Sequence, residues 1–256
     1  MGYYGYGGYA PQPTQAELRA KAAKMVKPGY KPVIIDGKNI ARSWWGKSWC
    51  DNIERYARLS NRIKRGKSYV KGNAVIDLSI NRGIIRAKVI GSRRTPYDVV
   101  IKIDPVNKRN YENILRVCSG KLESLSALEE GRFPEEYREL FTAEGKGLFP
   151  AEWEIHFSCS CPDYTSVCKH VAAALYAVGR RLDDAPLMLL ELRGIDTGEF
   201  TAAVLKKEAE RIWASSGKAI DIERMMSEEE AMRLFGFERP PEEMAKEFDY
   251  SKLFKS

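Results

Sequence analysis

The chain has 256 residues, of which 44% are hydrophobic and 30% are charged, and its formal net charge is +7. This composition is typical of one large or two small globular domains. No apolar run approaches the roughly 20 residues that a membrane-spanning helix needs. Residues 1–9 lack the basic stretch and apolar core of a secretory signal, so we expect a cytoplasmic protein with no membrane contact.

The charge is unevenly distributed along the chain. Fifteen Lys/Arg and only three Asp/Glu lie between Arg19 and Lys71, whereas the part after Asp104 carries a net negative charge. A basic front half favours a polyanionic partner, and we expect nucleic acid. The alternative is a solvated basic face that has no ligand or that meets the acidic back half.

The first predicted element follows a head of low complexity. Residues 1–14 hold four Tyr and four Gly, and we expect them to form a disordered tail. Thr14 is followed three residues later by Glu17, which is the pattern of a capping box. The sequence therefore predicts a short helix over residues 14–26.

A second helix is predicted over residues 44–59, with an apolar stripe that starts at its tryptophans. Trp44, Trp45 and Trp49 lie at helical spacing, and Ile53 continues the stripe. Large aromatic side chains with this spacing usually belong to a core, which is the interpretation we favour. The alternative is that they stack on unpaired bases.

Three strands are predicted next, over residues 75–80, 84–90 and 97–103, because apolar and polar residues alternate there. The Asn-Arg-Gly triplet at 81–83 is typical of a hairpin turn. We therefore expect an antiparallel meander with the Trp-containing helix packed on one face, as part of a basic α/β module over residues 15–106.

The remaining elements are mostly helical. Residues 107–147 are predicted to be a helical connector, with helices at 111–118, 121–129 and 135–141. A strand is predicted at 153–157, and further helices at 168–182, 185–192 and 201–214. The end of the chain is acidic and amphipathic, and its apolar anchors are Met225, Met226, Leu234 and Phe235.

The cysteines indicate a metal site rather than disulfides. Their number is odd, and three of the five lie within ten residues, which suits a reducing compartment. Cys159 and Cys161 form a C-x-C pair after the predicted strand, and Cys168 and His170 form a C-x-H pair at the start of the predicted helix. A Cys₃His set is a common structural zinc site, and the helix start favours the Cys168 thiolate. Four protein ligands leave no open coordination position, so we expect the zinc to be structural.

The sequence leaves two alternatives to this ligand set. The three cysteines could be buried thiols beside an ordinary helical histidine, and His156 is a rival ligand nearby. His156 alternates with Phe157 as a strand residue does, which argues against it. Cys50 and Cys118 are expected to be core residues.

At these positions the sequence resembles the SWIM zinc fingers, whose pattern is C-x-C, a variable gap and C-x-H. The local sequences CSCPDY and CKHVAAALY resemble the prokaryotic branch over about residues 154–179. The likeness extends to WWGKSW at 44–49, RGKSY at 65–69, GSR at 91–93 with Pro96 and Tyr97, and residues 187–194.

The resemblance implies a zinc-binding protein that acts through interactions and catalyses no reaction. Prokaryotic SWIM proteins are often encoded beside Snf-type helicase-like ATPases, so it implies such a partner. We expect an α+β fold: the antiparallel meander with its packed helix, a helical middle, a ββα-like SWIM finger over 148–195, and a helical acidic segment over 196–256.

No catalytic motif is present. Gly-Lys-Ser occurs at 46–48 and 66–68, but a phosphate-binding P-loop needs a glycine five residues before each, where Ala41 and Asn61 stand. Only two histidines are available for acid–base chemistry. We therefore expect no enzyme activity and no small-molecule substrate.

The candidate phosphate contacts are long cationic side chains beside glycine or turn residues. They lie in a predicted loop at 62–67 and in a pair after the second strand: Arg62, Lys64, Arg65, Lys67, Arg93 and Arg94. We expect a non-catalytic module that binds DNA or partners a helicase. The alternative is a protein–protein adaptor with no nucleic-acid contact, which the acidic back half and the C-terminal apolar anchors would support.

Overall fold

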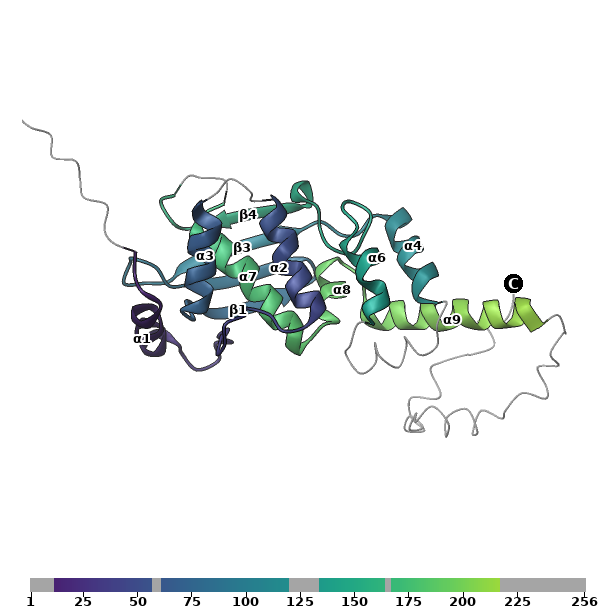
Figure 1. Ribbon diagram of the computed structural model, residues 1–256, viewed down its shortest axis with the longest axis horizontal. Helices are drawn as coiled ribbons and strands as arrows, with labels where there is room; N and C mark the ends of the chain where they lie inside the picture. The colour runs from purple at the N-terminus through teal and green to yellow at the C-terminus, as the bar shows by residue number, and fades with distance from the viewer. Residues whose placement is uncertain (1–11, 57–60, 120–133, 164–166, 217–256) are drawn as a thin grey trace, which may run out of the picture. The chain divides into compact units, whose positions relative to one another are not determined.

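The computed structural model describes residues 12–56, 61–119, 134–163 and 167–216 (Figure 1). The chain divides into two compact units, residues 1–208 and 209–256. Most of the predicted tail at 1–14, the predicted helix at 121–129 and the apolar anchors after residue 217 lie outside the described residues. Within the described ranges, no helix is long and apolar enough to cross a membrane.

A four-stranded antiparallel sheet organises the first unit (Figure 1). Its strands lie in chain order: β1 (Val75–Asn81), β2 (Ile84–Val89), β3 (Tyr97–Ile103) and β4 (Ile155–Cys159). The predicted meander is confirmed, and its turn has positive φ angles at Arg82 and Gly83, as a tight hairpin requires.

The strand that carries the C-x-C pair is part of this same sheet. β4 pairs with β3, and Cys159 lies opposite Val99. The predicted front module at 15–106 and the predicted finger at 148–195 therefore share one sheet. The boundaries that separate these two predicted segments along the chain stay a prediction.

The two faces of the sheet differ in polarity because side chains alternate along each strand. One cross-strand row consists of Leu78, Ala87, Val99 and Cys159, and its first three members are buried. The neighbouring row points to the opposite face and consists of Ser79, Arg86, Val100 and Ser158, of which all but Val100 are exposed.

Helix α7 (Lys169–Asp184) covers the apolar face of the sheet and contacts all four strands. Helices α2 (Trp44–Tyr56) and α3 (Asn61–Lys71) pack on its other side (Figure 1). Every residue from His170 to Gly179 is buried, so α7 is an all-round buried core helix. The helix that begins at the C-x-H pair is therefore the centre of the unit.

Both Gly-Lys-Ser segments are helical, and their glycines pack against α7. A Cβ on Gly66 would lie 2.4 Å from the Cβ of Ala172, and a Cβ on Gly46 would lie 2.6 Å from the carbonyl oxygen of Gly179. The predicted loop at 62–67 is wrong, because these residues lie within α3. Gly66 allows close helix contact there instead of marking a turn.

The tryptophans of α2 connect it to α7. Trp49 is fully buried and donates its indole N–H to the Leu175 carbonyl at 2.8 Å. The Trp45 indole donates to the Leu182 carbonyl at 2.9 Å. Trp49 confirms the core interpretation, and the half-buried Trp44 and Trp45 pack against the same core.

Seven further helical elements complete the described part of the chain. Helix α1 begins after Thr14, whose predicted capping box with Glu17 is confirmed. Short 3₁₀ turns precede α6 and β4. The elements are α1 (Gln15–Met25), α4 (Lys108–Cys118), η1 (Glu135–Tyr137), α6 (Arg138–Thr142), η2 (Glu152–Glu154), α8 (Met188–Leu192) and α9 (Thr197–Ser216).

Candidate metal centre

The end of β4 and the start of α7 bring four ligand-type side chains together. One ligand atom from each of Cys159, Cys161, Cys168 and His170 lies within 4.8 Å of all the others. The sulfurs of Cys159 and Cys168 are each 3.9 Å from Nδ1 of His170. In a tetrahedral zinc site a sulfur and a nitrogen ligand are separated by about 3.5 Å. The sulfur–nitrogen distances here are slightly longer, so the four side chains would bind zinc after a small movement toward one another.

The local structure at Cys168 stabilises a thiolate. Cys168 is the N-cap of α7, and its sulfur accepts the Val171 backbone N–H at 3.4 Å. Hydrogen bonding from the Cys159 thiol, followed by that from His170 and the Val171 amide, lowers the pKa of Cys168 to about 4. The helix dipole favours the same charge, as the sequence predicts.

The other two thiols hold their protons more tightly. The hydrogen bond to Cys168, together with burial, raises the pKa of Cys159, and burial raises that of Cys161. Three sulfurs at this separation cannot all carry a negative charge without a cation between them. A divalent metal would supply that cation, and it would do so in place of the shared protons.

The imidazole of His170 is fixed by aromatic rings. It stacks on Tyr97 with centroids 4.2 Å apart and meets Tyr69 edge-on at 5.7 Å. Its Nδ1 faces the sulfurs, while its buried Nε2 has no hydrogen-bond partner among the described residues. Gly91 leaves room for the ring, since a Cβ there would lie 2.6 Å from Nε2. The packing therefore fixes which ring nitrogen is available to a metal.

The rival ligands lie elsewhere in the structure. His156 is exposed, and its Nε2 lies 3.1 Å from the Asp104 carboxylate. It is not part of the group of ligand atoms. Cys50 and Cys118 are buried in the core, as predicted, and burial raises the pKa of each thiol to about 12.

Basic side chains from distant segments meet beside these ligands, at residues 160–163, which we call the ligand turn. Arg62 of α3 forms an ion pair with Asp163, and Arg93, which follows β2, donates to the Ser160 carbonyl at 3.3 Å. The Arg93 guanidinium also lies over the Tyr97 ring. The two predicted cationic segments therefore flank the ligand turn.

The other four predicted phosphate contacts differ in their exposure and in their partners. Lys64 and Arg94 are exposed, and Arg65 is half-buried. Lys67 instead forms an ion pair with Glu54 of α2 at 2.6 Å. The structure therefore brings Arg62 and Arg93 to the ligand turn and places Lys67 between α2 and α3.

Several residues that shape the site carry no sequence signal of their own. Tyr69 and Gly91 are indicated only by the family resemblance, and Tyr97 is otherwise only the first residue of a predicted strand. A single strand or loop residue gives no indication that it packs on a ligand. Lys21 of α1 was also missed. Its ammonium donates to the carbonyls of Gly91 and Arg93 at 2.5 and 2.7 Å, which fixes the backbone beside His170.

Comparison with known proteins agrees with this geometry. The family model of the SWIM zinc finger matches residues 158–179, which include all four ligand-type residues. The uncharacterized protein Rv2102 of Mycobacterium tuberculosis is 29% identical over 201 residues, which cover 78% of this chain and 68% of that protein. No solved structure matches the chain. The chain therefore carries a SWIM zinc finger, whose strand and helix are built into the core of a larger α+β unit.

Proposed function

We propose that this protein is a non-catalytic nucleic-acid-binding module that a structural zinc ion holds together. Zinc would be bound by Cys159, Cys161, Cys168 and His170. The donor set, its fit to a tetrahedron and the match to the SWIM zinc finger support this assignment. All four positions come from the protein, so the ion would carry no reacting water.

The zinc would act by joining the two halves of the core. Cys159 and Cys161 belong to the end of the sheet, and Cys168 and His170 belong to the central helix. Because binding energy at such a site is folding energy, the ion would stabilise the packing of α7 on the sheet.

The convergence of two basic segments on the ligand turn carries the nucleic-acid part of the proposal. Arg62 and Arg93 are 31 positions apart in the chain, yet both contact residues 160–163. The exposed Lys64 and Arg94 lie beside them in the sequence and would contact phosphates, while the contacts of Arg62 and Arg93 hold the ligand turn in place.

A titration of a labelled DNA duplex by anisotropy at several salt concentrations tests this part. Affinity should fall steeply as salt rises, because each phosphate contact releases counterions. The Lys64→Glu/Arg94→Glu variant should bind more weakly than Lys108→Glu/Arg109→Glu, which makes the same charge change at exposed positions of α4. No binding at low salt, or equal loss in both variants, would contradict the proposal.

The partner would be a Snf-type helicase-like ATPase, as the family resemblance implies, and it would supply any ATP hydrolysis. Purification of this chain together with that ATPase tests the assignment. If the two proteins do not associate and the chain still binds DNA, the partner assignment is wrong but the module assignment is retained.

A protein–protein adaptor is the second candidate, and one exposed side chain favours it. Trp153 is 68% exposed and lies in η2, just before the strand that leads to the ligands. Exposed tryptophans are frequent anchors of protein interfaces. Loss of ATPase association in Trp153→Ala, together with no DNA binding at low salt, would favour the adaptor over the nucleic-acid module.

A further inference from the structure

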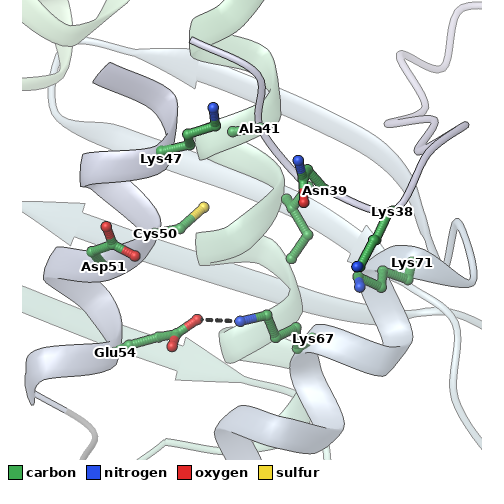
Figure 2. A pocket seen from close by; sticks show the side chains of 10 residues that line it. Lys38, Asn39, Ala41, Lys47, Cys50, Asp51, Glu54, Lys67 and Lys71 are labelled. Atoms are coloured by element: carbon green, nitrogen blue, oxygen red, sulfur yellow. Dashed lines mark hydrogen bonds and ion pairs between the residues drawn. The ribbon is translucent and has the colours of Figure 1, made fainter. Parts of the chain in front are cut away.

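A pocket of about 400 Å³ opens between α2, α3 and residues 38–41 (Figure 2). Its lining includes four lysines, Lys38, Lys47, Lys67 and Lys71, and two carboxylates, Asp51 and Glu54. The α3 lysines of this pocket lie in the second half of that helix, whereas its first turn contacts the ligand turn through Arg62. The pocket is therefore separate from the candidate metal centre.

Both Gly-Lys-Ser segments contribute to this pocket. Gly46 and Gly66 face α7, and the lysine that follows each one, Lys47 on α2 or Lys67 on α3, lines the pocket (Figure 2). Successive helical residues are about 100° apart around the axis, so a glycine on the packed side places the next side chain beside it. Each Gly-Lys-Ser segment thus provides a glycine that packs against α7 and a lysine that lines the pocket.

One of the four lysines is neutralised within the pocket. Lys67 pairs with the Glu54 carboxylate at 2.6 Å, and the hydroxyl of the buried Tyr176 donates to the same oxygen at 2.9 Å. Burial, followed by this hydrogen bond, raises the pKa of Tyr176, so the hydroxyl keeps its proton. Glu54 therefore orients Lys67 and contributes no free negative charge.

The other three lysines leave the pocket positively charged. Among the residues that the structure describes, no ion pair is formed by Lys38, Lys47 or Lys71, and only Asp51 remains to offset them. Cys50 also lines the pocket, and because burial raises its pKa to about 12 it adds no negative charge at neutral pH. Figure 2 shows the ammonium groups of Lys38 and Lys71 pointing toward one another, and an anion between them would offset their repulsion.

We propose that this pocket binds a phosphate group through the ammonium groups of Lys38 and Lys71. Lysine is a point-charge donor that suits the tetrahedral oxygens of phosphate. The site goes beyond the proposed nucleic-acid function, because its phosphate can belong to a nucleic-acid backbone or to a free phosphorylated small molecule.

Calorimetric titration of the full chain with inorganic pyrophosphate, and anisotropy with a DNA duplex, test the pocket. Lys38→Gln/Lys71→Gln removes both donors, and Lys24→Gln/Lys27→Gln makes the same change at exposed positions in and after α1. Pyrophosphate binding should weaken by at least about tenfold in the pocket variant, since charge-assisted hydrogen bonds are lost. The control should bind as the unmodified chain does, and both variants should unfold at the same temperature.

The source of the phosphate follows from the second probe. Equal weakening of DNA binding in the pocket variant would assign the site to a nucleic-acid backbone, and unchanged DNA binding would assign it to a small molecule. Absence of pyrophosphate binding by the unmodified chain, or equal binding by both variants, would overturn the proposal. The Lys64→Glu/Arg94→Glu variant should keep pyrophosphate binding, so failure of the nucleic-acid proposal remains distinguishable from failure of the pocket.

Discussion

The imidazole of His170 lies stacked on the phenol ring of Tyr97, with centroids 4.2 Å apart and an angle of 26° between the planes. The stack depends on the absence of a side chain at residue 91. A Cβ there would lie 2.4 Å from the Tyr97 ring and 2.6 Å from Nε2 of His170. One glycine thus decides whether the histidine ligand can keep its orientation.

Gly91→Ala should therefore displace the histidine. We expect the free energy of unfolding to fall by about 1–3 kcal/mol, as in other overpacked cores. Zinc affinity should fall by about 10–100-fold, the effect typical of disturbing groups around a metal ligand. Thermal unfolding and a competition titration with a zinc chelator measure the two effects. Gly37→Ala is the matched control, because a Cβ at residue 37 meets nothing within 4 Å.

Arg193 forms a buried ion pair with Glu154, the residue directly before β4, and so stabilises the segment that leads to the metal ligands. Its side chain is 1% exposed, and its two terminal nitrogens donate to Glu154 at 2.8 Å and to the Asp104 carbonyl at 2.6 Å. Arg193→Met would leave the Glu154 carboxylate without its partner. We expect the free energy of unfolding to fall by about 3–5 kcal/mol. Chemical denaturation measures this cost.

The control for that experiment is an arginine–carboxylate pair that is less buried, with side chains 20% and 56% exposed. Arg180 lies four residues before Asp184 and pairs with it at the end of α7. Arg180→Met should cost only about 0.3–0.5 kcal/mol. Equal costs for the two variants would show that burial does not strengthen the Arg193 contact.

The two cysteines outside the ligand set should resist alkylation. Burial raises the pKa of Cys50 and of Cys118 to about 12. The thiolate is the reactive form of a cysteine, and at pH 8 only about one part in ten thousand of each of these two would be thiolate. After treatment of the native chain with iodoacetamide and a chelator, mass spectrometry should find label in the ligand cluster, where Cys168 is a thiolate, and none at Cys50 or Cys118. Label at Cys50 or Cys118 before unfolding would contradict this ordering.

Local patterns predict much of this fold. The alternation at β1, β2 and β3, the capping box at Thr14 and the buried Trp49 all follow from short stretches of sequence. The ligand-type residues are predictable for the same reason, because two short-spaced pairs are enough to define a metal-binding set.

Long-range packing explains what the sequence analysis missed. Arg62 to Lys67 were expected in a loop because glycine interrupts their pattern, but contact between Gly66 and Ala172 favours a helix. No local pattern indicates that β4 joins β3, or that both Gly-Lys-Ser lysines line one pocket. These features depend on residues about 20 to 100 positions apart.

Metal analysis of the purified chain tests the central claim most directly. We expect one zinc ion per chain, lost in Cys168→Ser together with a clear fall in the unfolding temperature, because the ion joins the sheet to α7. Cys118→Ser makes the same replacement at a buried cysteine outside the ligand set and should keep its zinc. Full zinc retention and unchanged unfolding in Cys168→Ser would contradict the assignment of this cluster as the structural metal centre.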